Sequence, residues 1–187
     1  MKVRIGISLG PVAVPAVFGD AVDRVEELGV DSLWLSEMVF GSLVEPFAGM
    51  AYALSRTARL KVGTGVAVLP GRHPVLVAKQ LASLAGLAPG RVLPVFGLQP
   101  ARAAERALFE VPAGRRAAVF DESLRLIRLL LTQERVSFQG EFFTVDGAHR
   151  AAAGQAAGHL ARRQRPRRAA PRWPTGRRVA GQLADPR

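Results

Sequence analysis

Short apolar runs recur along the first hundred residues at nearly constant spacing. They begin at Val3, Ser32, Lys61 and Arg91, which are separated by 29, 29 and 30 residues. The strands expected within these runs are residues 5–9, 33–35, 62–69 and 92–96. Each of the first three runs is followed by a stretch with the apolar spacing of a helix. Because parallel strands must be joined by crossover helices, the pattern predicts repeated β-α units around a buried parallel sheet.

The stretches between the runs carry signals for the ends of helices. Asp20 is the expected N-cap of the first helix, and Gly29 stands where a left-handed residue would end that helix. Pro46 and Pro74 are expected in the first turns of the next two helices, where a missing N–H costs nothing. Farther on, apolar spacing predicts a helix over residues 115–131. Residues 136–138 and 141–145 then predict a hairpin around Gln139-Gly140.

The glycines and the length separate two folds that both use β-α units. A dinucleotide-binding sheet would carry G-x-G-x-x-G after its first strand, but residues 10–15 read GPVAVP. An eight-stranded β/α barrel needs about 250 residues, whereas this chain has 187. We therefore expect an α/β fold of the (β/α)8 barrel type, limited to about the first four β-α units plus a hairpin.

Composition changes sharply after Gly147. Residues 148–187 contain 11 Ala and 10 Arg but a single acid, Asp185, so most of the net charge of +11 lies there. We therefore divide the chain into a folded domain, 1–147, and an Arg/Ala/Pro/Gly-rich tail, 148–187, that is expected to be disordered. The tail is either a basic arm for a polyanion or the product of translation in a shifted frame of a GC-rich gene. Trp173 is its only aromatic residue, which disfavours nucleic acid as a partner.

Two further features of the sequence bear on location. The absence of cysteine excludes disulfides, thiolate metal sites and a cysteine nucleophile, and is typical of a reducing cytoplasm. The first apolar run is broken by Gly10, Pro11 and Pro15, which favours a strand over a signal peptide. No run approaches the ~18 apolar residues of a membrane span. We expect a cytoplasmic protein with no membrane segment and no metal site.

One stretch is more specific than the general pattern. Residues 60–97 read LKVGTGVAVLPGRHPVLVAKQLASLAGLAPGRVLPVFG. A strand with GTGV, an RHP turn, a helix with AKQLASL and a second strand after GRV follow one another there. This order resembles the luciferase-like monooxygenase family of flavin- and coenzyme F420-dependent oxidoreductases, which are built on an eight-stranded β/α barrel. The resemblance includes residues 1–147 nearly throughout and ends near Gly147.

The resemblance implies a cofactor at the carboxyl ends of the strands. In relatives, a cis peptide in the third strand forms a bulge behind the flavin or deazaflavin ring, and the matching bond is Gly65-Val66; alternatively, Gly65 merely eases strand packing. Glu37 matches an acidic position near the cofactor, and the alternative is a loop acid paired with a local arginine. The cofactor-binding residues implied in this way are Glu37, Thr64, Gly65, Val66, Ala67 and Gly97.

Other positions matter because they depart from the family or invite a catalytic role. Met38 stands where many relatives have an active-site histidine, and a thioether cannot transfer protons. Pro100 stands where the sugar-phosphate dehydrogenase branch has a catalytic glutamate, so the chemistry of that branch is not expected. His73 is expected to be extended and to orient the turn at the barrel mouth. Arg72 is expected to face an anionic cofactor tail or solvent, and Glu105 to be structural. No catalytic residue is assigned.

These implications predict a function and an alternative. The resemblance implies an oxidoreductase that uses coenzyme F420, or alternatively FMN, for hydride transfer or monooxygenation of a small organic substrate. Four units leave the sheet edges and the barrel interior open, so the chain should form homodimers or aggregate, and it can be an inactive fragment. The alternative is a non-enzymatic half barrel whose tail binds nucleic acid or another polyanion.

Overall fold

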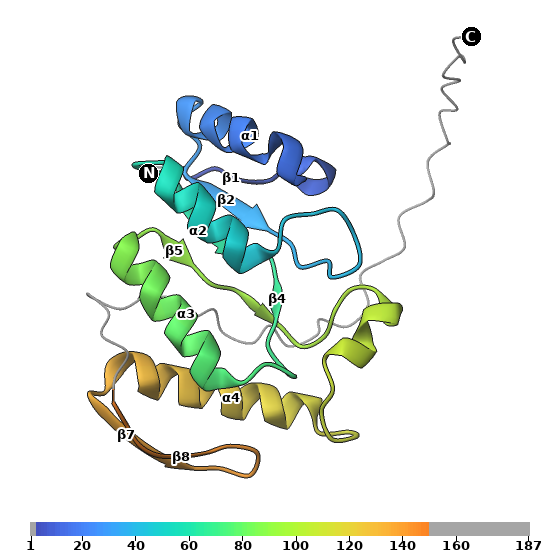
Figure 1. Ribbon diagram of the computed structural model, residues 1–187, viewed down its shortest axis with the longest axis vertical. Coiled ribbons are helices and arrows are strands. Elements are labelled where there is room, and N and C mark those ends of the chain that lie inside the picture. Colours follow the sequence, from blue (N-terminus) through green and yellow to red (C-terminus); the bar gives the residue numbers. More distant parts are fainter. Residues whose placement is uncertain (1–2, 150–187) are drawn as a thin grey trace.

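A parallel sheet forms the centre of the computed structural model, which describes residues 3–149 (Figure 1). Its four strands are arranged in the order β1 (Gly6–Ser8), β2 (Ser32–Leu35), β3 (Lys61–Thr64) and β5 (Val92–Leu93). A second parallel pair, β4 (Ala67–Val68) and β6 (Phe96–Gly97), continues β3 and β5. The predicted spacing and the parallel sheet are confirmed. The third predicted strand, 62–69, is divided into β3 and β4 at the bulge expected at Gly65-Val66, and the fourth, 92–96, is divided into β5 and β6.

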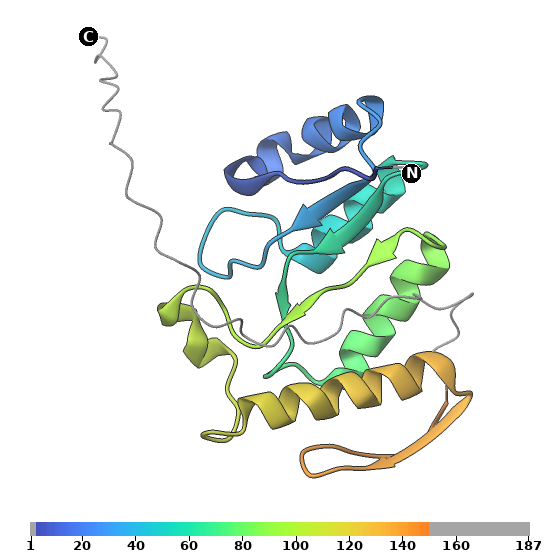
Figure 2. The same ribbon diagram turned by 180° about the vertical axis from the view of Figure 1, so that it is seen from behind.

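Three helices alternate with the strands, namely α1 (Pro15–Glu27), α2 (Pro46–Arg56) and α3 (Pro74–Leu87). Helices α2 and α3 cover one face of the sheet, and Figure 2 shows the opposite face. Each of the three helices has a proline in its first turn, as predicted for Pro46 and Pro74. None of the helices within residues 3–149 is long and apolar enough to cross a membrane.

The first helix differs from its prediction at one end and agrees at the other. Asp20 is not the N-cap, because α1 already begins at Pro15, whose fixed φ suits the first helical position. The earlier start also places Phe18 in the core, where it is 3% exposed. Gly29 has the predicted left-handed conformation, with φ of 69°. Its N–H donates to the Glu26 carbonyl, so the helix ends in a hydrogen-bonded turn.

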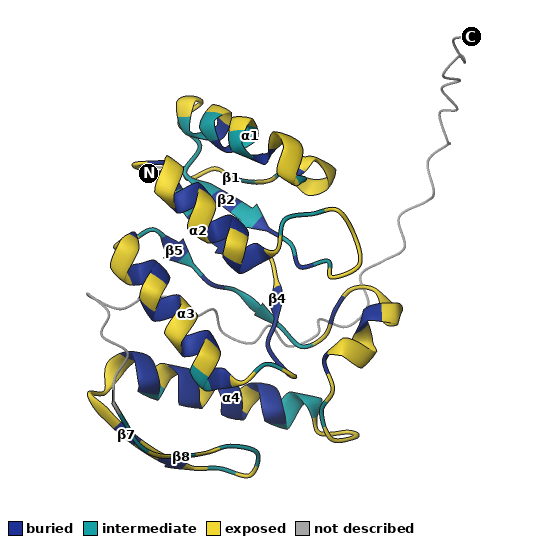
Figure 3. Cartoon of the chain, in the orientation of Figure 1, coloured by how far each residue is buried: buried dark blue, intermediate teal, exposed yellow. Residues whose placement is uncertain are grey.

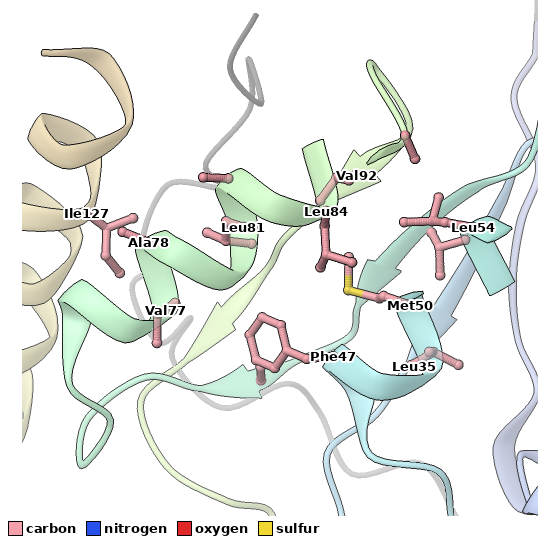
Figure 4. Packing of buried hydrophobic residues seen from close by; sticks show 14 of the residues in the cluster. Leu35, Phe47, Met50, Leu54, Val77, Ala78, Leu81, Leu84, Val92 and Ile127 are labelled. Atoms are coloured by element: carbon pink, nitrogen blue, oxygen red, sulfur yellow. The ribbon is translucent and has the colours of Figure 1, made fainter. Parts of the chain in front are cut away.

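The core lies between the sheet and the inner faces of the helices. Figure 3 shows buried residues on one side of α2 and α3 and exposed residues on the other. Met50 of α2 and Leu84 of α3 pack near Leu35 and Val92 of the strands (Figure 4). Complete burial of such a side chain contributes about 2 kcal/mol. The apolar spacing read from the sequence therefore describes real inward-facing surfaces.

A fourth helix and a hairpin follow the sheet. The helix α4 (Arg116–Thr132) packs against α3 and confirms the prediction for residues 115–131. The described residues also form two short 3-10 helices. The first, η1 (Gly10–Val12), lies between β1 and α1, and the second, η2 (Ala103–Leu108), lies between β6 and α4. Strands β7 (Arg135–Gln139) and β8 (Thr144–His149) pair antiparallel. A hairpin is thus confirmed.

The predicted turn of the hairpin was wrong. Residues 140–143 connect the two strands, and the second strand begins at Thr144 rather than at Glu141. The cause is Glu122 of α4, whose carboxylate accepts hydrogen bonds from three N–H groups, those of residues 141–143, each at 2.9 Å. Strand β8 continues through Gly147 to His149. The rest of the predicted tail lies outside the described residues.

Candidate cofactor site

The interruption between β3 and β4 exposes main chain at the carboxyl ends of the strands. The Gly65-Val66 peptide bond is cis, as the resemblance implied. The N–H of Gly65 donates to the Leu35 carbonyl at 2.7 Å, and Ser36 Oγ donates to the Gly65 carbonyl at 3.2 Å. The N–H of Glu37 donates to the Val66 carbonyl at 3.3 Å. The end of β2 therefore holds both residues of the interruption in place.

The surface at this point is small, apolar and flanked by buried groups. Val66 is 38% exposed, whereas Thr64 and Ala67 on either side are 0% exposed. Gly97 of β6 lies against Val66, and a Cβ at Gly97 would stand 2.6 Å from Val66 Cγ2. Because that separation is far below van der Waals contact, a side chain at Gly97 would displace Val66. Gly65 is exposed as well, so it contributes to the same surface.

Thr64 holds the two halves of the neighbouring strand together. Its Oγ1 donates to the Val95 carbonyl at 2.6 Å and accepts from the Val95 N–H at 2.8 Å. Val95 lies between β5 and β6, so a side-chain hydroxyl takes the place of a ladder partner there. Thr64 and Ala67 therefore support the exposed surface from within, since neither side chain reaches solvent.

Glu37 is a buried acid that is already paired. Its side chain is 3% exposed, and its carboxylate forms an ion pair with Arg72 and accepts from the Val68 N–H at 2.5 Å. Arg72 Nε donates to the Val68 carbonyl at 3.0 Å. The guanidinium also lies over the rings of Phe47 and Phe109, at 5.6 and 5.7 Å. Arg72 is 25% exposed, and its guanidinium is paired with Glu37, which agrees with the alternative stated for Glu37, pairing with a local arginine.

The loop after β2 is tied to η2 by groups far away in sequence. Glu105 is 1% exposed and accepts from the Phe40 N–H at 3.0 Å, which agrees with the structural role expected for it. Arg102 donates to the Phe40 carbonyl at 2.6 Å. The sequence did not reveal the partners of Ser36 and Arg102, because these lie 29 and 62 residues away and no local pattern predicts them.

His73 is the N-cap of α3 and is extended, as predicted, with φ of −72° and ψ of 118°. Its Nδ1 accepts from the Val75 N–H at 3.3 Å, so the imidazole caps the helix. Within residues 3–149, no three His, Asp or Glu side chains are grouped so that they could hold a metal ion. The structure brings Glu37, Gly65, Val66 and Gly97 together and leaves His73 in the turn beside them.

The sequence model of the family described as "luciferase-like monooxygenase" matches residues 3–186. The chain belongs to the luciferase-like monooxygenase family. The matched segment extends beyond Gly147, where the resemblance described above ends. The structures that resemble this chain are barrels of that family, so the predicted fold class, α/β of the (β/α)8 barrel type, is confirmed.

Individual relatives show how much of the barrel this chain represents. It is 31% identical over 142 residues to an F420-dependent glucose-6-phosphate dehydrogenase of Kineococcus radiotolerans, covering 72% of this chain and 42% of the relative. It is 35% identical over 135 residues to a limonene 1,2-monooxygenase of Rhodococcus erythropolis, covering 70% and 34%. An F420-dependent secondary alcohol dehydrogenase superposes with a TM-score of 0.72 at 26% identity, covering 86% and 52%. The chain thus spans about half the length of such relatives or less.

Proposed function

We propose that this chain forms the cofactor-binding half of a coenzyme F420-dependent oxidoreductase that acts on a small organic substrate. The observation that carries the proposal is the exposed Gly65-Val66 segment, held at the carboxyl ends of the strands by Ser36, Glu37 and Gly97. Reactive groups of β/α barrels lie at these ends. The similarity to two F420-dependent dehydrogenases supports this cofactor, with FMN as the alternative.

The residues present suit the face of a flat ring. Gly65 has no side chain, so the peptide plane and the Val66 isopropyl group offer an apolar surface that a ring can contact. Glu37, Thr64, Ala67 and Gly97 bind or support the ring through the segment that they hold. When bound, the deazaflavin supplies hydride transfer. No side chain is assigned a proton-transfer role, since Met38 stands at the position that would provide one.

The test is a titration of the 187-residue chain with oxidised F420 and, separately, with FMN. We expect weak binding of both, because the chain represents about half of a related barrel, with F420 bound more tightly. Val66→Asp should lower the F420 affinity at least tenfold, because it places a charge against the ring face. Leu76→Asp, which changes a 65% exposed residue of α3, is the matched control and should bind as the parent does.

Thermal melting of both variants separates loss of binding from loss of fold. Two results would contradict the proposal. One is F420 binding that Val66→Asp leaves unchanged, and the other is a folded parent chain that binds neither cofactor at millimolar concentration.

A further inference from the structure

A cleft lies outside the candidate cofactor site, between the 71–73 turn and the hairpin connection. It has a volume of about 350 Å³ and is lined by Gly71, Arg72, His73, Glu110, Val111, Pro112, Val119, Phe142 and Phe143. None of the six cofactor residues predicted from the sequence lines it. Small-ligand sites in proteins begin at about this size. We propose that this cleft binds a small, neutral ring compound that carries one hydrogen-bond acceptor.

The aromatic wall of the cleft is held in place by Glu122. The carboxylate of Glu122 accepts from the N–H groups of both Phe142 and Phe143 at 2.9 Å. Burial alone would raise the pKa of Glu122, but these N–H donors, that of Glu141 and the nearby Arg125 lower it, so the carboxylate remains a charged acceptor at neutral pH. The main chain of the two phenylalanines is therefore already in position before a ligand binds, which reduces the entropy cost of binding.

Side chains around the wall also fix the two rings. The guanidinium of Arg115 lies 5.3 Å from the centre of the Phe142 ring. It also forms an ion pair with Glu141 at 2.5 Å. The imidazole of His73 meets the Phe143 ring edge to face, with the ring centres 5.7 Å apart. Flat apolar ligands gain most from such preset aromatic surfaces.

The polar groups of the cleft select a neutral ligand with an acceptor. Because His73 Nδ1 accepts from Val75 N–H, a neutral imidazole carries its proton on Nε2, which can donate to a ligand. Arg72 is paired with Glu37, so it brings no unbalanced positive charge to attract an anion. Glu110 is exposed along the same lining and would repel one. A carbonyl on an uncharged ring satisfies all of these groups.

Acetophenone is the probe, and ethylbenzene is its partner with the same ring and no acceptor. We would titrate the 187-residue chain with each by NMR at pH 8. We expect acetophenone to bind about fivefold more tightly than ethylbenzene, as one hydrogen bond provides. His73→Asp keeps an acceptor for the helix cap but has no donor, so it should abolish this preference.

A second variant tests the wall. Phe143→Ala should weaken both probes about tenfold, whereas Leu87→Ala, at an 82% exposed position of α3 outside the cleft, should change neither. Equal binding of the two probes by the parent chain would overturn the proposal. So would an unchanged preference in a folded His73→Asp variant, binding that Phe143→Ala leaves intact, or no binding of either probe. F420 titration of the Phe143→Ala variant tests the proposed function separately from the cleft, because Val66 does not line the cleft.

Discussion

The amino and carboxyl ends of the parallel strands are built differently. At the amino ends, side chains bind main-chain groups of the last turn of α2 and of the loop that leads into β3. Glu26 accepts from three successive N–H groups, those of residues 58–60, at 2.9–3.0 Å. Arg91 donates to the carbonyls of Leu54, Thr57 and Leu60. These two polar side chains therefore form hydrogen bonds within the protein and stabilise its fold.

At the carboxyl ends, the same kinds of side chain hold main chain in place but leave part of it exposed. Glu37 and Arg72 bind each other and the backbone of Val68, while Gly65 and Val66 beside them face solvent. The polar side chains at the amino ends therefore stabilise the fold, whereas those at the carboxyl ends position a segment of main chain that is exposed to solvent. That division is the usual one in β/α barrels. Substitutions at the two ends should therefore separate stability from binding.

The largest expected effect is at the amino end. Arg91→Met should lower the free energy of unfolding by about 3 kcal/mol, because several partly buried carbonyls lose a charged donor at once. Urea denaturation measures the change. Arg59→Met is the matched control, since the Arg59 side chain is 76% exposed, and it should cost under about 0.5 kcal/mol. F420 binding by folded Arg91→Met should equal that of the parent, and a specific loss of binding would break the division between the two ends.

A smaller effect is expected for Glu26→Gln, about 2 kcal/mol at pH 7, because a neutral amide oxygen is a weaker acceptor for three N–H groups. Burial alone would raise the pKa of Glu26, but the N–H groups of Arg59, Ala58 and Leu60 and the charge of Arg59 lower it below 4.5.

The sign of the pH dependence follows from that lowered pKa. The unfolded chain binds the proton more readily, so the contribution of Glu26 to stability is complete above pH 4.5 and is lost as pH falls through the folded value. Unfolding free energies measured from pH 3 to 7 should therefore fall less steeply toward acid in Glu26→Gln than in the parent. Parallel profiles would show that folding does not lower the pKa of Glu26.

The smallest expected effect comes from replacing two threonines, one at each end of the strands. Thr64→Val at the carboxyl end removes the acceptor of the Val95 N–H, and Thr57→Val at the amino end removes a hydroxyl that donates to the Ala53 carbonyl. Each should cost about 1.5 kcal/mol in unfolding free energy. Only Thr64→Val should also weaken F420 binding and speed hydrogen exchange at Val95. Equal F420 affinities in the two variants would remove Thr64 from the candidate site.

A feature of the fold could be predicted from the sequence when the residues that determine it lie close together in the chain. The strand spacing, the prolines in first turns and Gly29 were predictable, because the pattern and the partner lie within one unit. The hairpin turn was not, because Glu122 sets it from 19 to 21 residues away. Asp20 failed as an N-cap because burial of Phe18 favours an earlier helix start.

The candidate site shows the same limit. The resemblance pointed to Gly65, Val66 and Glu37, and pairing of Glu37 with a local arginine was stated as the alternative, but the sequence did not identify Arg72 as that arginine. It also did not reveal that Thr64 binds Val95. Both partners lie on other segments of the chain, and pairing across segments depends on the fold itself.

The order of the sheet also has a consequence for how the protein is made. Each strand pairs with the one from the preceding unit, with partners such as Gly6 and Ser32, Ser32 and Lys61, or Val62 and Val92. A ribosome that adds about 5–20 residues each second releases such a unit every few seconds. Each new strand then finds its neighbour already in place, so the sheet can grow in the direction of translation without waiting for distant sequence.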